Sequence, residues 1–266
     1  MSTCAWIILA SFSVLIISYL YIKHKMIIAF NHKFEETCTH YQMPTDLAVP
    51  AAAQATTELC ATHCVAAYKL ACPDPVWPAS AHALKHGYVM RSGTAALVAL
   101  RGSITTRELA QDAHTKLVPF KGYGRVHSGF LEMLEEQMRD IGAAIEGATD
   151  VTVTGHSSGA AMGALLMLWL ARERPRKTRA RAVLFACPMV GDAETARGMS
   201  AALRHSVTFV TNTADVVPLL PPFGYYAPSA PHTLRFTTQS GSVLKNHSML
   251  HSYAPFANPA RFGPTR

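Results

Sequence analysis

Val151-Thr152-Val153-Thr154-Gly155-His156-Ser157-Ser158-Gly159 is the stretch that decides the fold. Four β-branched residues predict a short strand, and a G-x-S-x-G pentad follows at once and opens the apolar helix predicted over 160–174. A serine between a strand and a helix in this pattern is typical of a nucleophile elbow, a sharp turn that exposes the serine hydroxyl. The flanking glycines lack Cβ atoms, so strand and helix can approach closely. We therefore predict that Ser157 is a nucleophile at a helix N-terminus, where amide N–H groups stabilise an oxyanion.

The rest of the chain alternates between strand and helix patterns. The pattern predicts a hairpin from Tyr88–Arg91 and Ala95–Leu100, a helix over 126–146, and strands over 182–188 and 206–212. An alanine-rich helix is predicted within 51–70. Strands that alternate with helices predict an α/β fold with a mostly parallel central sheet.

A nucleophilic serine needs a base, and the base needs an orienting carboxylate. In hydrolases with this elbow the chain order is Ser, Asp, His. Asp215 comes directly after the strand predicted over 206–212, although a turn aspartate bonded to its own backbone is an alternative interpretation. Of the three histidines that follow, His232 opens a strand-like segment and is the weakest candidate, whereas His247 and His251 lie four residues apart.

Six blocks of sequence support this order. They are Leu100-Arg101-Gly102-Ser103, Val126-His127-Ser128-Gly129-Phe130, Gly155–Gly159, Phe185-Ala186-Cys187-Pro188-Met189-Val190-Gly191-Asp192, Asn212–Pro218 and His247-Ser248-Met249. Together they resemble the motifs of the fungal-type (class 3) lipase family of the α/β-hydrolase superfamily, over roughly residues 85–255. The resemblance implies an α/β-hydrolase fold and a lipid ester substrate, with no metal and no organic cofactor.

Carried over residue by residue, the resemblance assigns Ser157 as nucleophile, Asp215 as orienting acid and His247 as base. The backbone N–H groups of Ser103 and Ser158 form the implied oxyanion hole. Ser158 stands where the family usually has leucine, a change that a backbone donor tolerates.

The histidine block departs most from the family pattern. Many members have a tyrosine three residues after the histidine, whereas Tyr253 follows His247 by six. His251 therefore remains an alternative base. The resemblance also makes the segment 104–125 the lid.

The N-terminus carries one apolar segment, residues 5–22, without a charged side chain. A helix of this length spans about 27 Å, close to the thickness of the hydrocarbon core of a bilayer. No basic residue precedes the segment and no small-x-small cleavage site follows it, so we predict an uncleaved single-pass transmembrane anchor rather than a signal peptide. Lys23, Lys25 and Lys33 all follow the span, which predicts that the C-terminal bulk lies in the cytosol.

A second detail bears on this topology. Asn246-His247-Ser248 is an N-x-[ST] glycosylation acceptor that includes the predicted base. A glycan there would obstruct an apolar substrate, and this also favours the cytosolic side.

Composition excludes other classes of protein. Lys plus Arg exceed Asp plus Glu by 24 to 17, a net charge of +7, but no nucleic-acid motif accompanies this charge. Six cysteines in 266 residues are too few for a disulfide scaffold, and we expect free thiols.

His82 and His86 lie four residues apart, a spacing that could suit two metal ligands. No acidic ligand stands near them in the sequence, so no metal site is expected.

We expect three regions: an anchor over 1–25, a juxtamembrane and helical segment over 26–80, and a hydrolase domain over 81–266. The sequence favours a membrane-anchored serine lipase that hydrolyses carboxylic esters of acylglycerols through an acyl-enzyme. The alternatives are a phospholipase A1 or a monoacylglycerol lipase, and, in a different class, a catalytically inactive lipid-binding membrane protein. Head group, chain length and oligomeric state stay open.

Overall fold

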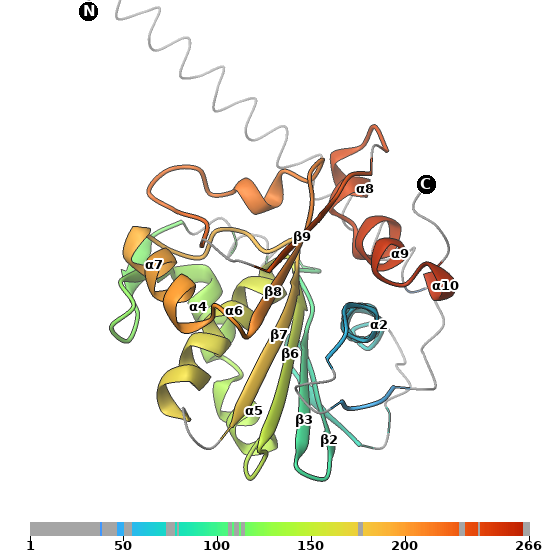
Figure 1. The fold of residues 1–266 in the computed structure, drawn as a ribbon, viewed down its shortest axis with the longest axis vertical. Helices are drawn as coiled ribbons and strands as arrows, with labels where there is room; N and C mark the ends of the chain where they lie inside the picture. Colours follow the sequence, from blue (N-terminus) through green and yellow to red (C-terminus); the bar gives the residue numbers. More distant parts are fainter. Residues whose placement is uncertain are drawn as a thin grey trace, which may run out of the picture.

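The protein is built around one twisted sheet with helices on both faces (Figure 1). The computed structural model describes residues 38, 47–50, 55–72, 78, 80–105, 108, 112, 115–174, 178–228, 232–238 and 240–262. The anchor predicted over residues 5–22 lies outside these residues. Within the described part of the chain, no helix is both long enough and apolar enough to cross a bilayer.

The central sheet has seven strands in the order β1-β2-β3-β6-β7-β8-β9. The pairs β1–β2 and β2–β3 are antiparallel, and the four pairs from β3 to β9 are parallel. This confirms the predicted α/β fold with a mostly parallel sheet. The strands are β1 (Ala81–Leu84), β2 (Gly87–Ser92), β3 (Ala95–Leu100), β6 (Asp150–His156), β7 (Arg179–Phe185), β8 (Val207–Asn212) and β9 (Thr233–Phe236), and a separate hairpin pairs β4 (Leu117–Pro119) with β5 (Arg125–His127).

The helices form two layers around the sheet (Figure 1). One layer contains α4 (Ser128–Glu135), α5 (Met138–Ala144), α6 (Ser158–Glu173) and α7 (Ala193–Ala202). The other contains α2 (Thr57–Lys69), α9 (Ala254–Ala257) and α10 (Pro259–Phe262). Three short elements follow the later strands: η2 (Val217–Leu219), α8 (Val243–His247) and the π-helix η3 (Met249–Tyr253).

Alternation along β6 explains how the two layers attach to the sheet. Val151 and Val153 are fully buried in the apolar cluster shared with α6, which is itself buried over most of its length. Thr154 points to the opposite face, where its hydroxyl bonds the carbonyl oxygen of Cys60 on α2 at 3.3 Å. Helix α2 lies before the domain boundary that we expect at residue 81, yet it packs on the same sheet as the rest of the fold.

The prediction of a single helix over 126–146 is wrong. The chain instead forms β5, α4 and α5, with the break at Gln137. The Gln137 side chain is buried and accepts a hydrogen bond of 3.2 Å from the backbone N–H of His86. The spacing of hydrophobic residues indicates only which face of a helix is buried. It cannot predict a helix break at a polar contact with a turn that is distant in the sequence.

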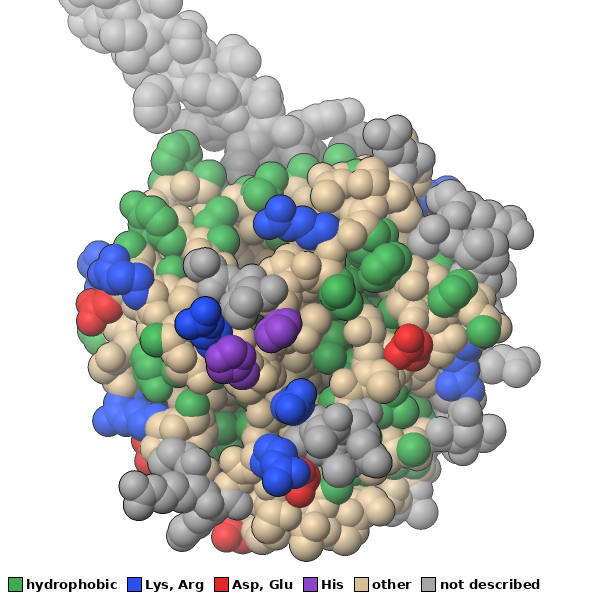
Figure 2. All heavy atoms as spheres, in the orientation of Figure 1, with side chains coloured by type: hydrophobic (Ala, Val, Ile, Leu, Met, Phe, Trp, Pro, Cys, Tyr) green, Lys and Arg blue, Asp and Glu red, His purple; other side chains and the backbone are tan. Residues whose placement is uncertain are grey.

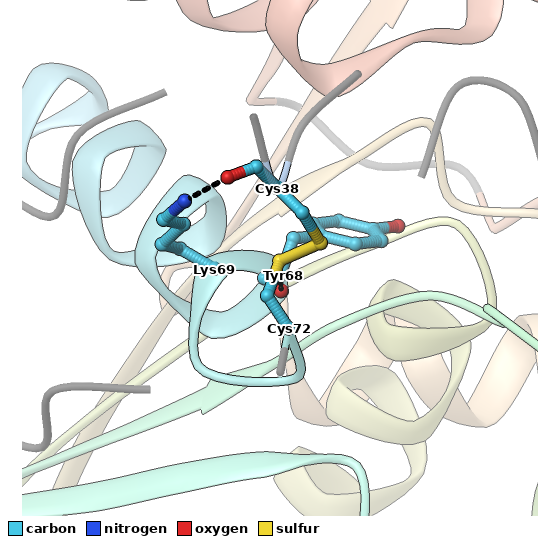
Figure 3. The surroundings of a disulfide bond; sticks show 4 residues. All are labelled: Cys38, Tyr68, Lys69 and Cys72. Carbon is cyan, nitrogen blue, oxygen red and sulfur yellow. Dashed lines mark hydrogen bonds between the residues drawn. A yellow bond between two sulfur atoms is a disulfide. The ribbon is translucent and has the colours of Figure 1, made fainter. Parts of the chain in front are cut away.

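The expectation of free thiols is wrong for Cys38 and Cys72, which form a disulfide at the end of α2 (Figure 3). Lys69, in the last turn of the same helix, donates a hydrogen bond to the Cys38 carbonyl oxygen. The two cysteines are 34 residues apart, and spacing alone does not indicate such a pair. Cys60 and Cys64 are free and fully buried.

Candidate active site

Ser157 lies at the junction of β6 and α6 in a backbone conformation that L-residues rarely adopt, with φ 59° and ψ −128°. Its amide donates a hydrogen bond of 3.0 Å to the Phe185 carbonyl on β7. A Cβ atom at Gly155 would lie 2.4 Å from the carbonyl oxygen of Gly159, so only glycine lets the strand and the helix pack this closely. These are the features expected of the predicted elbow.

Three side chains from distant parts of the sequence form one hydrogen-bonded chain. The Oγ of Ser157 lies 2.9 Å from Nε2 of His247, at the end of α8. Nδ1 of the same ring lies 2.8 Å from Oδ2 of Asp215, which follows β8. Both β6 and β8 end at the same edge of the sheet, which brings Ser157 and Asp215 together.

The Asp215 side chain is completely buried, so its charge depends on its hydrogen-bond donors. Oδ1 accepts from the Val217 amide at 2.9 Å, and Oδ2 accepts from His247 Nδ1 and from the Tyr253 hydroxyl at 2.7 Å. Burial raises the pKa of Asp215, but the charge of His247 and these donors outweigh burial, so the pKa lies below its ordinary value. When the His247 ring is neutral, the ionised Asp215 holds the remaining ring proton on Nδ1, which leaves Nε2 free to accept the proton of Ser157.

The structure separates the three candidate histidines. His247 is the one whose ring lies within hydrogen-bond distance of both Ser157 and Asp215. His251 places its Nδ1 3.0 Å from the hydroxyl of Ser248. The ring of His232, before β9, lies beside that of His205.

Ser103 and Ser158, predicted as oxyanion-hole residues, lie next to each other beside Ser157. Their hydroxyl oxygens are 2.9 Å apart, and both residues are buried. The Ser103 hydroxyl donates to Oδ2 of Asp112 at 2.8 Å, so the Ser158 hydroxyl donates to Ser103. Ser158 is the first residue of α6, and its amide has no acceptor within the helix.

Asp112 belongs to the segment that the family resemblance makes the lid. Burial raises the pKa of its carboxyl to about 7, and Glu108 adds to the rise, against the opposing effects of the Ser103 hydrogen bond and His247. Its Oδ1 has no hydrogen-bond partner among the described residues and is shielded from solvent. Near neutral pH this carboxyl is therefore close to half protonated.

A buried ion pair fixes the backbone just before Ser103. The Arg101 guanidinium bonds both carboxylate oxygens of Glu108, at 3.0 and 3.2 Å. The His86 ring is fully buried, with Nδ1 3.2 Å from Glu108 and Nε2 3.2 Å from Glu136. Two acidic side chains that are distant from His86 in the sequence therefore lie beside its ring in the fold. Among the described residues, however, no group of three or more histidine, cysteine or acidic side chains is arranged to hold a metal ion.

Sequence reasoning missed three residues that contact this site. Tyr253 donates to Asp215 from the π-helix η3, and its presence six residues after His247 was the available signal. Asp112 contacts Ser103 from a segment with no distinctive pattern. Tyr68, on α2, contacts the segments before Ser103 and before Ser157, and nothing in the alanine-rich helix marks it.

Comparison with known proteins relates part of this chain to lipases in sequence. Residues 97–225 match the family described as lipase (class 3). The chain is 43% identical over 83 residues to a secreted mono- and diacylglycerol lipase, MDL3, of Malassezia globosa, and the match covers 30% of this chain and 27% of that protein. It is 28% identical over 163 residues to phospholipase A1-IIgamma of Arabidopsis thaliana, covering 48% of this chain and 39% of that one. The chain therefore spans less than half the length of either relative.

Solved structures support the fold. Lipase II from Rhizopus niveus superposes with a TM-score of 0.58 at 21% identity, covering 74% of this chain and 92% of that one. The native Rhizomucor miehei lipase–propeptide complex gives 0.57 at 18% identity, covering 86% and 93%. At these identities the likeness concerns the fold alone. With the family match and the sequence relatives beside it, residues 97–225 of this chain belong to the class 3 lipase family of the α/β-hydrolase superfamily.

Proposed function

We propose that the protein is a serine lipase that hydrolyses carboxylic esters of acylglycerols, with Ser157 as nucleophile, His247 as base and Asp215 as orienting acid. The observation that carries the proposal is the continuous chain from Ser157 Oγ through His247 to the buried Asp215 carboxylate. The names of both sequence relatives, a lipase and a phospholipase, support the enzyme class.

In the proposed reaction Ser157 Oγ attacks the ester carbonyl carbon while its proton passes to His247 Nε2. The backbone N–H groups of Ser103 and Ser158 hold the oxyanion of the tetrahedral intermediate. The bond to the leaving alkoxide then breaks, and His247 gives the alkoxide its proton. A water molecule then attacks the acyl carbon in the same manner and gives a proton to His247. The bond between the acyl carbon and Ser157 Oγ breaks, His247 returns the proton to Oγ, and the carboxylic acid leaves. Asp215 stays ionised throughout and stabilises the imidazolium.

An apolar surface beside this site supports a lipid ester as substrate. The segment after Asp215 leaves large apolar side chains exposed, and among them Phe223 is 89% and Leu219 63% exposed. Figure 2 shows hydrophobic side chains along the upper part of this face, where Figure 1 shows the segment between β8 and β9. Residues 218–226 are thus suited to receive an acyl chain, although a proline-stiffened surface loop is the alternative interpretation. A phospholipase A1 or a monoacylglycerol lipase could use the same surface.

The proposal is tested with a fluorophosphonate probe and a panel of esters. The full-length chain is treated with the probe, and the modified residue is identified by mass spectrometry. Modification of Ser157, absent in Ser157→Ala, supports an enzyme; an unreactive chain that still binds lipid supports the inactive lipid-binding alternative. Rates on mono-, di- and triacylglycerols and on phospholipids then separate the candidate substrates.

We further propose that residues 5–22 anchor the protein in a membrane, with the hydrolase domain in an oxidising compartment. The Cys38–Cys72 disulfide supports this side, because cytosolic thiols are kept reduced. The glycosylation argument for the cytosol loses its force, because Asn246 is buried and its Nδ2 donates to the Ala214 carbonyl at 3.2 Å. Only the lysines after the span favour the cytosol. Protease protection on intact membranes tests the side: the domain resists protease until permeabilisation if the proposal holds, and is digested at once if it faces the cytosol.

A further inference from the structure

Tyr68 links three segments that each carry a group of the proposed reaction. Its hydroxyl accepts a hydrogen bond of 2.9 Å from the Gly102 amide, one residue before Ser103. The same hydroxyl lies 2.8 Å from Nδ1 of His156, the residue before Ser157. Nε2 of His156 in turn lies 2.8 Å from the backbone carbonyl oxygen of His247.

The neutral form of the His156 ring gives each bond in this network a single direction. A backbone carbonyl only accepts, so Nε2 of neutral His156 carries the proton and donates it to His247. Nδ1 of His156 is then an acceptor, and the Tyr68 hydroxyl donates to it. Burial raises the pKa of Tyr68 above its ordinary value, so the phenol keeps the proton that it donates. The oxygen of Tyr68 remains available to accept the Gly102 N–H.

The backbone of Gly102 and two aromatic rings pack closely around the phenol. A Cβ atom at Gly102 would lie 2.4 Å from the Tyr68 hydroxyl, so only glycine lets the backbone reach it. The rings of Tyr68 and His156 meet edge to face, and the ring of His156 lies against that of His247. The hydroxyl therefore sets the distance between the Ser103 segment and the Ser157 turn.

We infer that Tyr68 is a positioning residue for ester hydrolysis, which holds the oxyanion-binding amides and the base in register with Ser157. The inference rests on the proposed function, and it gives α2, which precedes the residues of the family match, a part in the reaction. Small displacements of preorganised donors cost rate rather than ground-state binding, because the oxyanion exists only after attack.

Another tyrosine, Tyr88, is buried and provides a matched control for a substitution of Tyr68. Tyr88 on β2 places its hydroxyl 2.6 Å from Nδ1 of His63 on α2, and Nε2 of His63 lies 2.8 Å from the Ala48 carbonyl oxygen. This is the same phenol–imidazole–carbonyl arrangement, but it joins α2 to β2 and involves none of the segments that carry Ser103, Ser157 or His247. Tyr88→Phe therefore measures how much the loss of a buried hydrogen bond of this kind lowers stability, without a change in the segments of the proposed reaction.

The experiment compares full-length wild type, Tyr68→Phe and Tyr88→Phe on p-nitrophenyl butyrate. We expect kcat of Tyr68→Phe to fall at least tenfold with KM changed by less than threefold, and the affinity for butylboronic acid, which forms a tetrahedral adduct with serine, to fall by a similar factor. Tyr88→Phe keeps kcat within twofold while its Tm falls. A kcat of Tyr68→Phe less than tenfold below wild type, or an equal loss of kcat in Tyr88→Phe, overturns the inference.

A second variant keeps the test decisive if Tyr68→Phe folds poorly. His156→Leu breaks the same network from its other side, so we expect a similar loss of kcat and no further loss when the two changes are combined. Additive losses overturn the inference. A wild-type chain that neither turns over the ester nor reacts with a fluorophosphonate overturns the proposed function as well, whereas a reactive wild type with an unimpaired Tyr68→Phe overturns the role of Tyr68 alone.

Discussion

The hydroxyl of Tyr253 donates a 2.7 Å hydrogen bond to Oδ2 of Asp215, the same oxygen that accepts from His247. Removal of this donor in Tyr253→Phe raises the pKa of Asp215 and makes the carboxylate a stronger partner for protonated His247. We expect the acidic limb of the kcat/KM profile to move up by as much as about one pH unit, and the free energy of unfolding to fall by about 1.5–3 kcal/mol, the range for hydrogen bonds to charged groups. Tyr88→Phe, whose acceptor is a neutral ring, should lose stability without a shift of the profile; an unshifted profile in Tyr253→Phe contradicts the prediction.

The second prediction concerns the base. His247→Ala and Ser157→Ala should each lower kcat by at least about 10⁴-fold, because base and nucleophile act as a unit. His251→Ala is the matched control and should keep kcat within about threefold, since its ring bonds Ser248. Steady-state rates on a soluble ester measure all three. An inactive His251→Ala beside an active His247→Ala would reverse the assignment.

The third prediction concerns Asp112. Its pKa is raised to about 7 in the folded protein, so between about pH 4 and 7 the folded state holds a proton that the unfolded chain has lost. The free energy of unfolding therefore falls as pH rises through this window, by up to about 4 kcal/mol from this group. Asp112→Asn removes that contribution, and urea unfolding of both proteins from pH 4 to 7 measures the difference. Asp140→Asn, on the exposed side of α5, is the control, and a difference between wild type and Asp112→Asn that stays constant with pH would refute the prediction.

The fourth prediction concerns the disulfide. Closing a loop of 34 residues restricts the unfolded chain, and the chain-entropy relation gives a stabilisation of about 3–4 kcal/mol. Cys72→Ser should lower the free energy of unfolding by that amount, and so should dithiothreitol acting on the wild type. Cys187→Ser, which removes a free thiol, is the control and should leave the effect of dithiothreitol intact. Equal stability of wild type and Cys72→Ser under oxidising conditions would argue against the bond.

The mostly parallel sheet and the places of Ser157 and Asp215 beside strands could be predicted because each depends on local sequence, whereas the choice of His247 over His251 came from the family resemblance. The β-branched run 151–154, the glycines around Ser157 and the strand before Asp215 carry their signals within a few residues. The family match and the observed sheet confirm the family and the fold. The roles of the three residues in a reaction stay predictions.

The missed features all depend on contacts between distant residues. Tyr68 meets Gly102 and His156 across 34 and 88 residues, and Cys38 pairs with Cys72 across 34. No periodicity encodes such pairs, because periodicity reports only which face of an element is buried. Tyr253 reaches Asp215 because the chain after His247 forms a π-helix, and sequence spacing alone did not predict this wider turn.

The backbone conformation of Ser157 has a consequence for how this protein can change over evolutionary time. A non-glycine residue held there costs about 1–3 kcal/mol of stability, and glycine would relieve most of it. Ser157→Gly is thus a single substitution that strengthens the fold while it removes the proposed nucleophile. A lineage released from selection for hydrolysis would drift toward glycine at this position, so the serine persists only where selection for chemistry outweighs the gain in stability.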